Sequence, residues 1–114
     1  MVKVELVLER GFLKSCRVSG HAGAGPKGSD IVCAAVSVLA RTAFKVLSER
    51  KGIVIQGRNP KRGEFWMEIT ALSEENLDFL HGVWAFLEEG FLSVSKEYPD
   101  FCIVSVEEKY QYGS

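Results

Sequence analysis

The chain has 114 residues, of which 46% are hydrophobic and 25% are charged. This balance is typical of an ordinary globular domain and excludes a disordered, collagen-like or low-complexity chain, while the length predicts one domain over residues 1–114. No apolar run approaches the roughly 18 residues of a membrane span. Residues 1–6 alternate apolar and charged side chains, where a signal peptide would be continuously apolar. We therefore expect a cytoplasmic protein that does not enter a membrane.

The net charge of −1 hides an asymmetry between the two halves of the chain. Residues 1–62 carry 12 basic and 4 acidic side chains, whereas residues 63–114 carry 2 basic and 11 acidic ones. Folding can interleave the halves so that the charges mix. Alternatively, it can leave a basic face suited to nucleic acid and an acidic face that attracts a basic protein, an attraction that added salt would weaken.

The first half of the chain predicts a hairpin, a loop and a helix. Residues 2–9 alternate as a half-buried strand, Glu9-Arg10-Gly11 forms a turn, and residues 12–19 form a second strand. Phe12, Cys16 and Val18 share one face of that second strand. Residues 20–29 hold four glycines and a proline and form a loop. Ser29 or Asp30 then caps a helix that runs to about residue 50 and is stopped by Gly52.

The second half predicts another hairpin, a helix and a last strand. The strands cover 53–58 and 64–71 around a turn at 59–63. Ser73 caps a helix from 74 to about 96, and the last strand covers 101–108. The order ββαββαβ predicts an α+β two-layer sandwich, with a mixed, largely antiparallel sheet and both helices on one face.

Trp66 lies on a strand face with Glu68 and Thr70, so it is either exposed for a partner or partly covered by a loop.

The three cysteines, Cys16, Cys33 and Cys102, have to be judged separately because no CxxC pair exists. This spacing argues against a disulfide framework or a zinc ribbon. Cys16 and Cys102 fall on apolar strand faces and are predicted to lie in the core. No histidine, cysteine or carboxylate spacing indicates a metal site, and we expect no cofactor.

The segment Gly23-Ala24-Gly25-Pro26-Lys27-Gly28 fits the GxGxxG pattern of dinucleotide-binding loops. Its context argues against that interpretation, because the preceding strand belongs to a hairpin and not to a βαβ unit. A loop that binds or covers a substrate is the better interpretation.

Cys33 and His21 form the pair best suited to chemistry. With a cap at Ser29 or Asp30, Cys33 lies in the first helical turn, where free N–H groups and the helix dipole stabilise a thiolate. His21 lies where the second strand enters the loop, so its imidazole can act as the base for a thiol nucleophile. Asp30 and Ser37 share the helical face of Cys33. Two alternatives stay open: Cys33 as small core filler, and Asp30 as a helix cap.

These residues resemble the signature of one known family. The matching segments are Gly20-His21-Ala22-Gly23 and Gly28-Ser29-Asp30-Ile31-Val32-Cys33-Ala34-Ala35-Val36-Ser37. Both closely resemble the motif of the ribosomal-processing cysteine protease family Prp. The length and the ββαββαβ order also match along essentially the whole chain.

The resemblance implies a cytosolic, homodimeric cysteine endopeptidase. Its substrate would be a ribosomal protein precursor, the twenty-seventh protein of the large subunit, from which it removes a short hydrophobic N-terminal extension. Cys33 would be the nucleophile and His21 the general base, with Asp30 and Ser37 as supporting residues. The glycines of the substrate loop would give it freedom to move: Gly20, Gly23, Gly25 and Gly28.

The acidic half of the chain would attract such a basic ribosomal protein. The alternatives are a non-catalytic ribosome- or RNA-binding module and a plain dimerisation module. The first of these would use the basic residues of 50–62: Arg50, Lys51, Arg58, Lys61 and Arg62. That stretch lacks interleaved aromatic residues and any RNA-binding signature, so nucleic-acid binding is the weaker interpretation.

Overall fold

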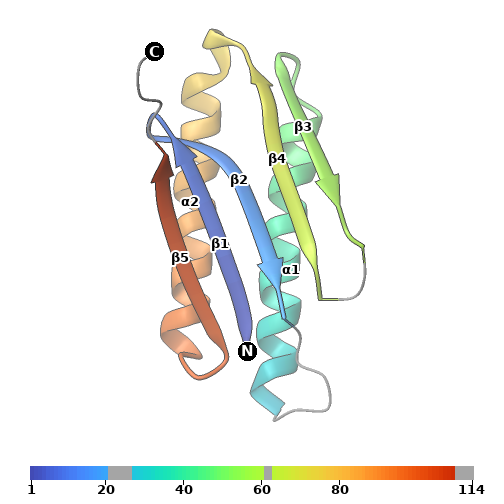
Figure 1. Ribbon diagram of the computed structural model, residues 1–114, viewed down its shortest axis with the longest axis vertical. Coiled ribbons are helices and arrows are strands. Elements are labelled where there is room, and N and C mark those ends of the chain that lie inside the picture. Colours follow the sequence, from blue (N-terminus) through green and yellow to red (C-terminus); the bar gives the residue numbers. More distant parts are fainter. Residues whose placement is uncertain (21–26, 61–62, 110–114) are drawn as a thin grey trace.

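The computed structural model describes residues 1–20, 27–60 and 63–109. Their order confirms the predicted ββαββαβ sequence of elements, with one short 3₁₀ turn added before the second helix (Figure 1). The elements are β1 (Val2–Glu9), β2 (Phe12–Ser19), α1 (Lys27–Ser48), β3 (Ile53–Arg58), β4 (Phe65–Leu72), η1 (Glu74–Asn76), α2 (Leu77–Glu97) and β5 (Cys102–Lys109).

The five strands form one sheet in the order β3-β4-β2-β1-β5, so β3 and β5 are its edges. β1 pairs parallel with β5, and the other three neighbouring pairs are antiparallel. α1 and α2 lie side by side behind this sheet in Figure 1. The predicted α+β class with a mixed, largely antiparallel sheet and both helices on one face is confirmed.

The β1–β2 hairpin contains an irregularity that the alternating pattern missed. Arg10 and Gly11 both have positive φ, which suits the tight turn between the strands. The pairing then shifts between Val7 and Leu8. Because one extra residue enters β2 there, Leu13 is buried together with Cys16, while Phe12, which the alternation placed on that face, is partly buried and packs against the core.

The start of α1 differs from the prediction. The helix begins at Lys27, so neither Ser29 nor Asp30 is its N-cap, and Asp30 lies within the first turn. Cys33 consequently lies in the second turn. The influence of a helix terminus falls off within one turn, so the first-turn stabilisation expected for a Cys33 thiolate does not apply.

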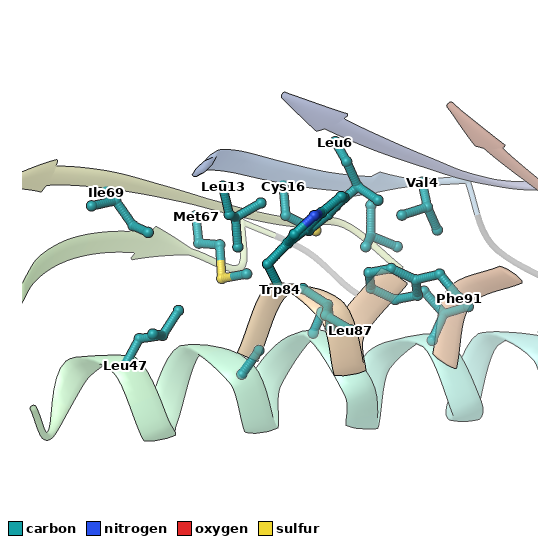
Figure 2. Close-up of a cluster of buried hydrophobic side chains, with 14 of the residues drawn as sticks. Val4, Leu6, Leu13, Cys16, Leu47, Met67, Ile69, Trp84, Leu87 and Phe91 are labelled. Carbon is teal, nitrogen blue, oxygen red and sulfur yellow. The ribbon is translucent and has the colours of Figure 1, made fainter. Parts of the chain in front are cut away.

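The core lies between the sheet and the two helices. Side chains from the sheet, including Leu13 and Met67, point toward Trp84 and Leu87 of α2 (Figure 2). One face of α1 also packs onto the sheet, through the fully buried residues Val32, Val36, Ala40 and Leu47.

By length and composition alone, residues 30–48 of α1 could cross a membrane, with a hydropathy of 1.7 over the window. The segment is not an uninterrupted apolar run, because it contains Arg41 and Lys45, and one of its faces packs onto the sheet.

The charged side chains separate onto opposite flanks. α1 and β3 lie on one flank and carry exposed basic residues: Arg41, Lys45 and Arg58. α2 and β5 lie on the other flank, where the exposed acidic residues Glu89, Glu97 and Glu107 accompany two exposed basic ones, Lys96 and Lys109. The basic and acidic halves of the sequence thus interleave in the sheet but not in the helix layer.

Candidate active site

Cys33 lies at the edge of the buried face of α1. Its neighbours Val32 and Val36 are fully buried against the sheet and hold this part of the helix in place. Cys33 itself is half-buried. Its thiol is therefore fixed by a rigid helix while the residue stays partly open to solvent, as a nucleophile requires.

Asp30 and Ser37 flank Cys33 along the same side of α1. Asp30 precedes it by three residues and is exposed, whereas Ser37 follows by four and is half-buried. Residues three and four apart are neighbours on a helix surface, so the helix brings these three side chains to one side, as the sequence predicted. Since Asp30 is not the N-cap, capping does not explain its presence there.

Gly20 fixes the place where the chain leaves β2. Its φ is +82°, and a Cβ atom built there would overlap the backbone carbonyl oxygen of Met1. Only glycine combines this left-handed conformation with so close an approach. The predicted residues His21, Gly23 and Gly25 lie outside the described residues, but Gly20 directly precedes His21. Gly28 falls in the first turn of α1, not in a loop.

The other two cysteines are buried, as predicted. Cys16 is fully buried in the core, and this burial raises the pKa of its thiol to about 12. Cys102 is also buried, and burial raises the pKa of its thiol as well. Since the thiolate is the reactive form, neither side chain is a competent nucleophile at neutral pH.

We expect iodoacetamide at pH 8 to alkylate Cys33 and to leave Cys16 and Cys102 unmodified in the folded protein. With a pKa of about 12, only about one Cys16 thiol in 10⁴ is ionised at that pH. Peptide mapping after a timed reaction measures the three sites separately. Unfolding in guanidinium should make all three react, whereas labelling of Cys16 ahead of Cys33 in the folded protein would contradict this ranking.

A groove runs along α1 from Ser37 to Lys45 on the side that faces β3. It has a volume of about 590 Å³. Its floor contains Phe44 and Phe65, whose rings meet edge to face with centroids 6.2 Å apart. Gly57 of β3 completes the floor, since a Cβ atom there would lie 2.6 Å from Cε2 of Phe44.

Sequence reasoning missed this groove, although a glycine inside a strand pattern is a signal that something packs closely against the backbone.

The basic stretch 50–62 does not form one continuous patch in the described residues. Nε of Arg50 donates to Oδ1 of Asn76 at 2.9 Å, and its guanidinium lies over the Phe79 ring at 4.2 Å. Arg58 is at the opposite end of β3, and a strand of six residues is about 20 Å long. Lys61 and Arg62 lie outside the described residues. Arg50 therefore has a structural role, which weakens the RNA-binding alternative.

Trp66 is half-buried and lines a small pocket with Pro60 and Glu64, in agreement with partial cover by the β3–β4 connection. Among the residues that the structure describes, no group of three histidine, cysteine or carboxylate side chains is placed to hold a metal ion. Nor does β2 fit a dinucleotide-binding unit, because both of its sheet neighbours are antiparallel.

Comparison with solved structures shows the same fold in bacterial proteins. SMU.848 from Streptococcus mutans superposes with a TM-score of 0.78 at 22% identity, covering 96% of both chains. An essential ribosomal processing protease Prp from S. aureus, in complex with a substrate peptide, gives 0.78 at 17% identity over 94% of this chain and 100% of that one. The S. aureus protease with a covalently linked product peptide gives 0.72 at 19% identity, with coverage of 96% and 100%.

No curated protein sequence gives a significant match. The family described as Cysteine protease Prp matches residues 1–103. This range includes His21, Asp30, Cys33 and Ser37 and nearly every element of the fold. The chain therefore belongs to the cysteine protease Prp family and is a cysteine protease.

Proposed function

We propose that this protein removes the short hydrophobic N-terminal extension from a large-subunit ribosomal protein, the twenty-seventh. The observation that carries the proposal is the family match over residues 1–103, which contains both Cys33 and His21. The S. aureus proteins of the same fold are described as ribosomal processing proteases with substrate and product peptides. Ribosomal processing is the function that these relatives support.

In the proposed mechanism, Cys33 is the nucleophile and His21 the general base. His21 accepts the thiol proton, and Sγ of Cys33 attacks the carbonyl carbon of the scissile peptide bond. The C–N bond breaks as His21 donates the proton to the leaving amine. The mature ribosomal protein leaves, and the extension stays bound to Cys33 as a thioester. Water then attacks the thioester carbonyl, releases the extension as a carboxylate and restores the thiol.

Asp30 and Ser37 are proposed as positioning residues. Both lie on the side of α1 that carries Cys33, and Asp30 is exposed in the first turn of the helix, nine residues after His21 in the sequence. An anionic side chain there can orient the imidazole and stabilise its protonated form, the role that a third group has in Cys–His enzymes.

The proposal is tested with the full-length ribosomal precursor and the mature ribosomal protein as a control. The protein should shorten the precursor by one cut at the end of its hydrophobic extension, identified by intact mass, and leave the mature form unchanged. An uncut precursor, or cuts at several unrelated places, would contradict the proposal.

The proposal includes a cytoplasmic location, where ribosomal proteins are made, and a homodimer. Both follow from the resemblance to the family. Sedimentation velocity measures the oligomeric state, and a single monomeric species across a concentration series would contradict the homodimer.

A further inference from the structure

We propose that the groove between α1 and β3 binds the part of the substrate next to the scissile bond, as an extended apolar segment without Lys or Arg. Phe44 and Arg41 would set its specificity. This inference rests on the proposed function, because the occupant is the substrate that Cys33 cuts.

The groove is continuous with the candidate active site. At 100° per residue, Ser37 and Phe44 lie within about 40° of Cys33 around the helix. Ser37 is about 6 Å and Phe44 about 16 Å along the helix axis from Cys33. A segment of about five extended residues, at roughly 3.3 Å each, therefore reaches from the aromatic floor to the thiol.

The walls of the groove suit an extended apolar chain. Phe44, Phe65 and Gly57 form an apolar floor, on which side chains of an extended peptide can rest. β3 is an edge strand of the sheet, so alternate backbone N–H and C=O groups on its outer side are not used by β4. Addition of a strand to such an edge is a common mode of peptide recognition, in which backbone bonds give affinity and pockets give specificity.

The charges around the groove exclude a basic segment. Arg41 and Arg58 lie at its margin, and no acidic side chain is among the described residues that line it. A Lys or Arg in the bound segment would meet like charge, whereas Asp or Glu would be attracted. The groove thus favours apolar residues interrupted by acidic or neutral ones.

A second apolar groove, between α1 and α2, provides an internal control. It has a volume of about 620 Å³ and includes Phe86, which is 73% exposed. Leu39 and Val46 line it in place of Ser37 and Phe44, so it lies further around α1 from Cys33, although both grooves share Val38 and Thr42. Phe44 and Phe86 therefore compare the two grooves with the same residue type.

The test measures kcat/KM on a peptide that spans the scissile bond and carries the apolar extension. Phe44→Ala should lower kcat/KM about 10- to 100-fold, chiefly by raising KM, because the peptide loses an apolar contact with the floor of the groove. Phe86→Ala should leave it unchanged. Arg41→Glu, at an exposed position, should reverse the preference between two peptides that differ by Glu or Lys within the extension. Thermal melts establish that each variant is folded under assay conditions.

Binding of the same peptide to the Cys33→Ala protein, followed by fluorescence anisotropy, separates this inference from the proposed function. Binding that Phe44→Ala weakens, together with no cleavage by the parent protein, would sustain the groove and overturn the proposed function. If the parent cleaves the peptide and Phe44→Ala cleaves it equally fast, the inference that this groove binds substrate is wrong, while the proposed function stands. The same holds if Phe86→Ala slows cleavage and Phe44→Ala does not. An unchanged Glu/Lys preference in Arg41→Glu would also contradict the groove.

Discussion

Cys33→Ala should abolish processing of the ribosomal precursor, with a loss of about 10⁴-fold or more in the rate of cleavage. Removing the nucleophile of a covalent mechanism eliminates the thioester route, and the remaining binding groups support only slow attack by water. Because Cys33 is half-buried on a helix whose neighbours Val32 and Val36 anchor it, the substitution should leave the fold intact. Precursor cleavage followed by intact mass over a long incubation measures the effect.

Two matched cysteine variants test whether the loss is specific. Cys16→Ala and Cys102→Ala remove buried thiols, so they should lower stability while retaining cleavage at temperatures where the protein is folded. Full activity of Cys33→Ala would contradict the proposal that the Cys33 thiol is the nucleophile.

Asp30→Asn, which keeps the size of an exposed side chain but not its charge, should lower kcat about ten-fold or more without changing the melting temperature.

Gly20→Ala should reduce both the stability and the activity of the protein. A non-glycine residue at φ +82° costs about 1–3 kcal/mol of backbone strain, and the added Cβ would also overlap the Met1 carbonyl. Relief of that overlap has to move the chain directly before His21. A displacement of about 1 Å at a catalytic group can lower the rate about 100-fold. Denaturant unfolding and kcat measure the two effects separately.

Gly11→Ala is the matched control for this prediction. Gly11 has φ +81°, almost the same as Gly20, but a Cβ atom there meets nothing within 4 Å. It therefore retains the backbone strain, about 1–2 kcal/mol, without the overlap and far from the candidate site. Equal losses of stability and activity in the two variants would show that the approach of Gly20 to Met1 has no bearing on the site.

The regular parts of the fold could be predicted because local patterns determine them. Alternation in residues 2–9 and the apolar stripe of the second helix follow the periods of a strand and a helix, and both elements are present. The predicted start of the second helix was wrong: residues 74–76 form a 3₁₀ turn, Ser73 makes no side-chain cap bond, and α2 begins at Leu77. The extra residue in β2 could not be predicted, since alternation alone places only Phe12 toward the core, whereas Leu13 is buried as well. The burial of Leu13 depends on pairing with β1, a contact between strands.

The candidate site could be predicted only in part. The spacing of Asp30, Cys33 and Ser37 places them on one side of any helix, and the structure agrees. The start of that helix was misplaced, because Ser29 and Asp30 are good caps in isolation while the helix extends back to Lys27. The groove needs Phe44 and Gly57 from separate elements to meet, which no local pattern contains.

The most direct test of the account is to trap the covalent intermediate. The protein is mixed with the precursor peptide, quenched in acid during turnover and analysed by intact mass and peptide mapping. We expect an adduct equal to the N-terminal product minus one water, located on Cys33 and absent from Cys33→Ala. Turnover that proceeds without an adduct and persists in Cys33→Ala, or an adduct on Cys16 or Cys102, would contradict it.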